Sequence, residues 1–505
     1  MDNEKRRLEI GLLSEEDLFL FTDYYELTSG KCNFDHGVNN IITETYFFRE
    51  IPKHLGSYIV AAGLEQFIAF IQILNRGLSK KHREWLEKVA GKDLTKEFLD
   101  YLENFRFRGD IYAVLEGTPV FPNEPVINVT GPSIDVQLLE TYLLNIVNFE
   151  SLVATKASRI VYAAKGRNVL YSPKTVVDFG ARRAHGRDAA VLAARAAYIG
   201  GFDGTSLVIA AMKWNIPFVG TIPHKFIEER YREIKSFRET ELQAFMEYAE
   251  SFPHNAVLLV DTYDTIEGIK NAIKVGLELK KRGYKLAGIR LDSGDPIELS
   301  KIARKMLDEV GLTDAKIFAS DRLDEFIIEH ALDHGAPIDG FGVGTKLVTG
   351  ANYDSLTREG GISALDGIFK LAETSDESGR MIPTTKFTSS LSKATLPGRK
   401  QVWRRIENGQ FVEDIITLWD EEVDGAKPLL VPIIIKGEIV YDFPSLKEIR
   451  RYCAEQLAAL PDKYRRIRGS ETYPVSGKLR SLMEEMFVRF RREYSLSASI
   501  PCVSP

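Results

Sequence analysis

The sequence predicts an α/β protein: an α/β barrel, an amino-terminal α+β domain, and a carboxyl-terminal extension that packs back on that domain. Three observations predict this architecture. Apolar β-like runs alternate strictly with helix-like periodicity between residues 175 and 342, which is typical of successive βαβ units and, over so many units, favours a barrel over an open sheet. The residues before this series mix helical and β-like patterns, and 505 residues allow two or three domains.

Residues 1–132 form the predicted amino-terminal α+β domain. A helix is expected from Ser14, a strand over 41–48, and helices between 55 and 102. The stretch 111–130 is β-rich, and its prolines separate short strands rather than allowing one long strand.

Residues 133–380 form the predicted barrel domain. Apolar residues recur at helical spacing over 133–164, which predicts one long helix or a pair of helices. The expected strands that follow are 175–179, 217–221, 256–260, 285–291, 315–319 and 338–342, and the expected helices are 186–199, 265–281, 297–310 and 323–333.

Residues 381–505 form the predicted carboxyl-terminal segment. It begins with a basic, loop-rich stretch and continues with short strands over 401–435 and helices over 445–494. Because there is no long linker and no internal repeat, we expect this segment to complete the amino-terminal domain.

Composition argues against several classes of protein. The chain has 66 basic and 72 acidic residues, and its net charge of -6 argues against non-specific nucleic-acid binding. The start M-D-N-E-K-R-R-L-E-I lacks the apolar region of a secretory signal. The longest apolar stretch, 55–74, contains Glu65, Gln66 and Gln72, which favours a buried helix over a membrane span. We therefore expect a cytoplasmic location.

The three cysteines lie far apart and form no C-x-x-C pattern: Cys32, Cys453 and Cys502. This spacing suggests neither a disulfide framework nor a thiolate metal site.

The stretch G-I-R-L-D-S-G-D-P, residues 288–296, joins a predicted strand to a predicted helix. In a parallel sheet such a junction lies at the carboxyl edge, where ligands bind, so Arg290 and Asp292 are candidate site residues. The alternative is an ordinary βα turn, with Asp295 at the helix start and Pro296 at its first position.

Further polar residues follow neighbouring predicted strands in the same way: Asp261, Asp264, Ser320, Asp321 and Asp324. A ring of acids at this edge could hold Mg²⁺, a hard cation that prefers oxygen ligands. For any single aspartate, a helix cap is an equally good interpretation.

The turn F-G-V-G-T-K follows the last predicted barrel strand and exposes backbone amides suited to a phosphate group. Its candidate residues are Gly342, Gly344 and Thr345. Alternatively, the glycines only allow a positive φ. Neither a Walker A sequence nor G-x-G-x-x-G is present, so a P-loop or Rossmann nucleotide site is not expected.

Two other strand ends carry aromatic and basic residues. In D-F-G-A-R-R-A-H-G, Phe179 could stack on a flat ring while Arg182 and Arg183 grip a carboxylate, although the arginines could also be ordinary surface residues. In G-T-I-P-H-K, His224 follows the predicted strand 217–221. A lone histidine is more often structural, but this position at a strand end makes it a catalytic candidate.

Taken together and in order, these blocks resemble nicotinate phosphoribosyltransferases of the type II phosphoribosyltransferase family. The resemblance is carried by T-D-Y-Y-E-L-T, F-P-N-E-P-V, D-F-G-A-R-R-A, G-F-D-G-T-S, G-T-I-P-H, D-T-Y-D-T, I-R-L-D-S-G-D, F-G-V-G-T and S-K-A-T-L-P-G-R-K-Q-V-W-R, from residue 20 to beyond 400.

The resemblance implies an ATP-assisted C–N ligase that forms nicotinate mononucleotide and pyrophosphate from nicotinate and 5-phosphoribosyl 1-pyrophosphate, the first step of NAD salvage. It implies an irregular α/β barrel, Mg²⁺, ATP as co-substrate, and a head-to-tail homodimer with shared active sites. The carboxyl-terminal segment would then contribute loops that face the dimer partner.

The resemblance also implies roles for individual residues. His224 would be phosphorylated by ATP, Phe179 and the partner subunit's Tyr24 would sandwich the pyridine ring, and Arg182 with Arg183 would lie near its substituent. The residues implied around ribose and phosphates are Arg290, Asp292, Ser320, Asp321, Gly342, Gly344 and Thr345, with Asp261 and Asp264 near the magnesium. The basic residues implied at the phosphates, some from the second subunit, are Arg49, Lys386, Lys393 and Lys400.

Two alternatives remain open at this point. Asp203 matches an acid that also occurs in nicotinamide phosphoribosyltransferases, where it favours an amide substrate, whereas the paired arginines favour nicotinate. The other alternative is a non-catalytic metabolite-binding relative. The chain also departs from the common G-T-x-A-H-S pattern at Pro223 and Lys225, which makes ATP coupling the less specific part of the prediction.

Overall fold

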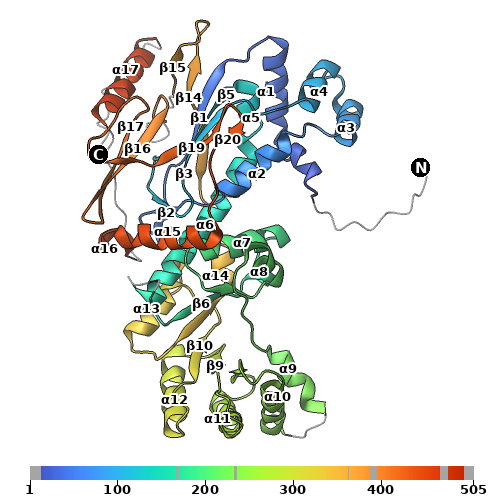
Figure 1. Ribbon diagram of the computed structural model, residues 1–505, viewed down its shortest axis with the longest axis vertical. Helices are drawn as coiled ribbons and strands as arrows, with labels where there is room; N and C mark the ends of the chain where they lie inside the picture. The colour runs from blue at the N-terminus through green and yellow to red at the C-terminus, as the bar shows by residue number, and fades with distance from the viewer. Residues whose placement is uncertain are drawn as a thin grey trace, which may run out of the picture.

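A computed structural model describes residues 13–166, 169, 171–232, 236–361, 363–386, 395–466 and 476–493. It consists of a seven-stranded antiparallel sheet and a six-stranded parallel sheet, with the long helix α6 (Glu140–Lys165) running between them (Figure 1). Buried residues from Leu143 to Ala164 pack α6 into the apolar cores of both parts. This helix and α5 (Ser133–Gln137) confirm the helical pattern predicted over 133–164.

The antiparallel sheet combines strands from three distant parts of the chain. Its order is β15-β14-β1-β5-β3-β19-β20. The bounds are β1 (Ile41–Phe48), β3 (Asp110–Val114), β5 (Pro125–Pro132), β14 (Gly367–Ser375), β15 (Met381–Pro383), β19 (Leu430–Ile435) and β20 (Glu438–Ile439). The short pair β2 (Ile59–Val60) and β4 (Pro119–Val120) lies outside it. Strands late in the sequence therefore flank the amino-terminal ones on both sides.

Helices of the amino-terminal part pack around this sheet. They are η1 (Glu16–Leu20), α1 (Tyr24–Asp35), α2 (Leu64–Leu74), α3 (Lys80–Ala90) and α4 (Lys96–Glu103). The helix expected from Ser14 is thus a short 3-10 helix followed by α1, with a break at 21–23. The helices expected between 55 and 102 are α2, α3 and α4.

The parallel sheet has the order β7-β6-β11-β10-β9-β8. Its strands are β6 (Thr175–Asp178), β7 (Gly204–Thr205), β8 (Val257–Leu259), β9 (Gly288–Leu291), β10 (Lys316–Ala319) and β11 (Gly340–Val343). The helices α7 (Arg187–Ile199), α11 (Thr265–Lys281), α12 (Pro296–Glu309) and α13 (Glu325–Asp333) alternate with these strands, as predicted. Because β11 pairs with β6, the strand order is cyclic, and within the described residues β7 and β8 remain the two edges.

The prediction of a strand over residues 217–221 is wrong. Only Phe218 pairs, through a single bridge with Thr205. The physical reason is that β7 ends at Thr205 and the chain enters α8 (Val208–Trp214) three residues later, so no longer partner strand exists.

The carboxyl-terminal segment forms strands and helices where the sequence predicts them. The sheet of β16 (Lys400–Glu407), β17 (Gln410–Leu418) and β18 (Lys427–Pro428) is followed by α15 (Leu446–Ala459), α16 (Asp462–Arg465) and α17 (Gly477–Glu493). Within the described part of the chain, Cys32 and Cys453 are free thiols, and no helix is long and apolar enough to span a membrane.

Candidate active site

The carboxyl end of β9 brings Arg290 into the site. Its Nη2 donates a hydrogen bond to the Ile222 carbonyl at 3.0 Å, and its Nη1 lies 3.7 Å from Asp292 Oδ1. Burial lowers the pKa of the guanidinium, while the charges of Asp292 and Asp261 act to raise it. Its Nε is buried without a hydrogen-bond partner, so this arginine retains an unused donor.

Asp292, at the end of β9, contacts both His224 and the end of β10. Its carboxylate accepts a hydrogen bond from the Ser320 hydroxyl, and its Oδ2 lies 3.6 Å from His224 Nε2. The other ring nitrogen of His224, Nδ1, lies 3.1 Å from Thr262 Oγ1. The structure thus brings His224, Arg290, Asp292 and Ser320 together.

His224 is the first residue of α9 (His224–Glu228), directly after Pro223 at the N-cap. Proline fixes its own φ and favours extended backbone at the residue before it, which defines where the helix begins. The position of His224 beside the strand ends therefore depends on this turn, since 217–221 forms no strand.

Asp261 and Asp264 have different environments. Asp261 Oδ2 accepts hydrogen bonds from the Ser293 hydroxyl at 2.5 Å and from the Asp292 N–H at 3.3 Å, and its Oδ1 is buried without a partner. Asp264 instead caps α11 by accepting the Glu267 N–H at 2.9 Å. No group of three or more His, Cys, Asp or Glu side chains suited to a metal ion occurs among the described residues.

The turns after β6 and β11 pack on each other. The Phe179 N–H donates to the Val343 carbonyl at 2.9 Å. A Cβ at Gly342 would lie 2.5 Å from the Phe179 ring, so only glycine leaves room for this aromatic side chain. Gly344 and Thr345 follow directly, with Thr345 opening the short helix α14 (Thr345–Val348).

The paired arginines lie on the 3-10 turn η3 (Ala181–Arg183), and both side chains are exposed. Arg182 is close enough to Arg290 for its charge to lower the pKa of that residue. Asp321 is also exposed, in the turn after β10.

Sequence reasoning missed Asp178, the last residue of β6. Its carboxylate accepts the Gly180 N–H at 2.7 Å and the Thr205 hydroxyl at 2.8 Å, which holds the turn that presents Phe179. Burial raises the pKa of Asp178. Thr262 was missed as well, although it directly follows Asp261, which the strand-end pattern singled out.

Asp203 does not join this site. It pairs with Lys165 at 2.7 Å and Arg450 at 2.8 Å, and it accepts the Val176 N–H at 2.8 Å near the start of β6. Phe179 lies beyond the other end of that strand, three residues after Val176, which corresponds to about 10 Å at 3.3 Å per residue. Asp203 therefore lies at the opposite edge of the sheet from Phe179. The exposed residue that follows β7 is Ser206.

A second set of predicted site residues lies on the antiparallel sheet. Tyr24 is the first residue of α1 and is 55% exposed. Arg49 and Lys386 line a pocket of about 320 Å³ together with Lys370 and Thr395. Figure 1 shows α1 and β14 at the end of the molecule opposite to β9 and β10, so one chain does not bring the two sets together.

Lys400 is buried rather than exposed to a ligand. Its ammonium donates to the carbonyls of Leu396 at 2.8 Å and Gly398 at 2.6 Å, and burial lowers its pKa to about 7. It therefore fixes the turn next to Thr395 in the basic pocket. The predicted residue Lys393 lies outside the described residues.

Comparisons with known proteins cover nearly the whole chain. Residues 20–148 match the model of the nicotinate phosphoribosyltransferase N-terminal domain, 175–380 the nicotinate phosphoribosyltransferase family, and 424–483 the C-terminal domain. A nicotinate phosphoribosyltransferase of Bacillus subtilis is 40% identical over 495 residues, covering 93% of this chain and 94% of the relative. A Mycobacterium tuberculosis enzyme of the same name, pncB2, is 40% identical over 459 residues, covering 90% and 91%.

The fold agrees with a solved structure. The crystal structure of human nicotinic acid phosphoribosyltransferase has a TM-score of 0.75 and 25% identity, and the match covers 92% of this chain and 99% of the human one.

Proposed function

This chain belongs to the nicotinate phosphoribosyltransferase family, and from that premise we propose how its residues carry out the reaction. The chain is an enzyme of NAD biosynthesis that transfers the phosphoribosyl group of 5-phosphoribosyl 1-pyrophosphate to nicotinate. The observation that carries the residue-level proposal is the convergence of His224, Arg290, Asp292 and Ser320 at one sheet edge. Because both proposed phosphorylated co-substrates are strongly charged and do not cross membranes freely, we place the reaction in the cytoplasm.

The pyridine ring would stack on Phe179, whose ring is held over Gly342. Arg182 and Arg183 are exposed beside it and would bind the carboxylate of nicotinate in charge-assisted hydrogen bonds. The attacking ring nitrogen needs orientation rather than activation, and stacking combined with a fixed carboxylate supplies it. The nicotinamide alternative loses support because Asp203 is held by Lys165 and Arg450.

The ribose and diphosphate would lie along the ends of β9, β10 and β11. Breaking the bond between ribose and diphosphate builds positive charge on the sugar and negative charge on the leaving group. Asp292 can stabilise the former and Arg290 the latter, while Ser320, Asp321, Gly342, Gly344 and Thr345 would bind the ribose 5-phosphate.

A magnesium ion fits this site only together with the substrate. Mg²⁺ is usually held by one or two carboxylates plus phosphate oxygens. Asp261 has a buried carboxylate oxygen without a hydrogen-bond partner, whereas the carboxylate of Asp264 caps a helix. We assign Asp261 as the first candidate ligand and Asp264 as the weaker one; when bound, the ion would neutralise charge on the diphosphate.

ATP assistance would pass through His224. Because Nδ1 faces Thr262, Nε2 is the nitrogen that would accept the γ-phosphoryl group of ATP, with the phosphorus–oxygen bond to ADP broken. In the neutral ring, the proton would then remain on Nδ1, and this N–H would donate a hydrogen bond to Thr262 Oγ1. The carboxylate of the adjacent Asp292 would repel a phosphoryl group on Nε2. Phosphorylation of His224 would therefore affect Asp292 and, through it, the ribose site.

We further propose a head-to-tail homodimer with shared sites. It is supported by the separation of Tyr24, Arg49 and Lys386 from the strand-end residues. It is also supported by exposed apolar side chains on α8 and in the segment that follows it, where Met212 is 74% and Phe218 72% exposed. The partner subunit would then supply the second aromatic and the basic pocket.

The finer fold proposal is an irregular barrel. The cyclic strand order supports it, as does the hydrogen bond from Arg290 to Ile222, which connects β9 to the chain that follows Phe218.

A product assay tests the proposed function. Purified protein is incubated with 5-phosphoribosyl 1-pyrophosphate, Mg²⁺ and either nicotinate or nicotinamide, each with and without ATP, and the mononucleotide is measured by mass spectrometry. We expect nicotinate mononucleotide, in larger amount with ATP. His224→Ala should abolish the ATP stimulation, whereas the control His254→Ala, before β8 at the opposite sheet edge, should keep it.

Three outcomes would contradict the proposal. Product from nicotinamide alone would favour the amide-specific alternative. Calorimetric binding of nicotinate without turnover would favour a non-catalytic relative. ATP stimulation that persists in His224→Ala would rule out a phosphohistidine at this residue.

A further inference from the structure

Two neighbouring loops carry the proposed ribose 5-phosphate site. Ser320 and Asp321 follow β10, and Gly344 and Thr345 follow β11, which pairs with β10 in parallel register. Each loop leads into a helix, α13 or α14, and a phosphate held by both loops requires a fixed distance between them.

Lys346 connects these two loops directly. It follows Thr345, and its ammonium lies 3.2 Å from Oδ2 of Asp324, the residue that caps α13. Asp324 is fully buried, and its other oxygen accepts the Ile327 N–H at 2.9 Å. Since a buried carboxylate needs compensating partners, this ion pair ties the loop after β11 to the loop after β10.

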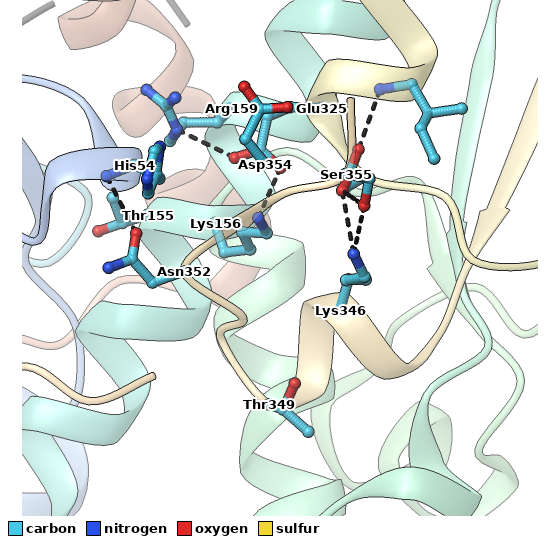
Figure 2. A network of polar contacts seen from close by, with 12 residues as sticks. His54, Thr155, Lys156, Arg159, Glu325, Lys346, Thr349, Asn352, Asp354 and Ser355 are labelled. Atoms are coloured by element: carbon cyan, nitrogen blue, oxygen red, sulfur yellow. Dashed lines mark hydrogen bonds and ion pairs between the residues drawn. The ribbon is translucent and has the colours of Figure 1, made fainter. Parts of the chain in front are cut away.

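Ser355 completes the connection. Its hydroxyl donates to Asp324 Oδ2 at 2.5 Å and accepts a hydrogen bond from Lys346, which Figure 2 shows reaching toward it. The Lys346 ammonium also lies 4.7 Å from the centre of the Tyr353 ring. The three polar groups therefore form a closed cluster of mutual contacts.

The hairpin that carries Ser355 is itself fixed. Its strands are β12 (Tyr353–Asp354) and β13 (Glu359–Gly360), and Asp354 accepts the Leu356 N–H at 2.9 Å. Just before β12, the buried Asn352 accepts the His54 N–H at 3.0 Å, and Figure 2 shows this contact beside the Arg159–Glu325 pair. Lys346 is thus attached to a hairpin that has its own contacts with the segment around His54.

The loop after β10 needs such support. Asp321 and Arg322 have φ values of 73° and 47°, in the left-handed region that non-glycine residues rarely adopt. Two consecutive residues in this region persist only where the surrounding structure holds them. The loop is held on both sides: Ser320, just before it, bonds to Asp292 and the Leu291 carbonyl, and Asp324, two residues after it, bonds to Lys346 and Ser355.

We infer that Lys346 is a positioning residue that sets the spacing of the two phosphate-binding loops through Asp324 and Ser355. The inference rests on the proposed function, because it takes these loops as the ribose 5-phosphate site. Lys346 does not touch substrate in this arrangement, and its effect passes through Thr345 on one side and Asp321 on the other.

The test compares Lys346→Met, Lys346→Arg and a matched control, Lys285→Met. Lys285 pairs with Asp314 at 2.6 Å on the surface before β9, at the opposite sheet edge. KM is measured for 5-phosphoribosyl 1-pyrophosphate and for nicotinate, and affinity for 5-phosphoribosyl 1-pyrophosphate is measured by calorimetry, which needs no turnover.

We expect Lys346→Met to raise KM and Kd for 5-phosphoribosyl 1-pyrophosphate about tenfold or more, because small displacements of binding groups have effects of this size. KM for nicotinate should stay within about twofold, since Phe179 packs on Gly342 and Val343 of β11 itself, before the loop that carries Lys346. Lys346→Arg should recover most of the loss because a guanidinium can still pair with Asp324, and Lys285→Met should resemble the wild type.

Unchanged affinity for 5-phosphoribosyl 1-pyrophosphate in Lys346→Met, or an equal rise in both KM values, would overturn the inference. If Lys346→Met does not fold, Ser355→Ala decides, with a rise of about threefold or more in that Kd expected and no change overturning it. Absence of product from the wild type despite normal binding would count against the proposed function alone. Absence of binding by the wild type would overturn both.

Discussion

Buried charged side chains determine much of this molecule's chemistry at the scale of single residues. Glu44 on β1 is half-buried near Glu140, Glu26 and Lys370, with one carboxylate oxygen buried without a hydrogen-bond partner, and this burial is the main reason that its pKa is raised to about 8. Burial acts in the opposite direction on a cation, which is why Lys400 has its pKa lowered to about 7.

Glu44 should make stability depend on pH. Its pKa is raised from 4.5 to about 8, so the folded state binds an extra proton between these values. The stabilisation is complete below pH 4.5 and is lost as the pH rises through 8. We expect Glu44→Gln, which cannot titrate, to become more stable than the wild type with rising pH, by up to about 1.4 kcal/mol per pH unit in this window.

Denaturant unfolding of both proteins at several pH values between 5 and 9 measures this difference. The exposed Glu97→Gln on α4 serves as the control and should follow the wild type. Parallel curves for wild type and Glu44→Gln would show that Glu44 titrates normally.

At the scale of elements, three successive βα turns share one arrangement, in which one aspartate lies at the strand end and a second one caps the next helix. Each carries two aspartates three residues apart: Asp261 and Asp264, Asp292 and Asp295, Asp321 and Asp324. The second of each pair caps the following helix, accepting a backbone N–H at 2.9, 2.8 and 2.9 Å respectively. The first lies at the strand end, where the proposed substrate site is.

This arrangement predicts opposite effects within one turn. Asp295→Ala removes the cap of α12 and should lower the free energy of unfolding by about 1 kcal/mol while leaving kcat/KM unchanged. Asp292→Ala should lower kcat/KM about 100-fold because it removes charge stabilisation at the ribose.

Equilibrium unfolding and steady-state kinetics on both variants check this. Comparable losses of activity in the two variants would contradict the assignment of Asp295 to the helix cap.

At the scale of the whole molecule, the residues of the proposed site fall into two separate sets. The strand-end set, which includes His224, Arg290 and Asp292, lies at the parallel sheet. The other set, Tyr24, Arg49 and Lys386, lies at the antiparallel sheet, and α6 runs between the two sheets (Figure 1). A head-to-tail dimer joins the two sets without any rearrangement within a chain.

Mixed dimers test this arrangement. Asp292→Ala and Arg49→Ala damage opposite sets, so a heterodimer purified through two different tags contains one intact site and should recover about half of wild-type activity. A heterodimer of Asp292→Ala with Arg290→Ala, both in the strand-end set, should recover none. Equal activity in the two heterodimers would show that each chain forms its site alone.

The sequence by itself determined the alternation of strands and helices, the strand end that carries Arg290 and Asp292, and the family. These features depend on local periodicity, turn residues and ordered motifs, and each of these signals comes from residues that are close together in the sequence. The same local patterns did not distinguish Asp261 from Asp264, and they predicted a strand at 217–221 where only Phe218 pairs.

Only the tertiary structure decided which polar residues meet. It placed Asp203 at the opposite sheet edge with Lys165 and Arg450, buried Lys400 against backbone carbonyls, and joined Lys346 to Asp324 and Ser355. The physical reason is that burial and ion pairing depend on contacts between segments far apart in the chain, and no local pattern of residues encodes those contacts.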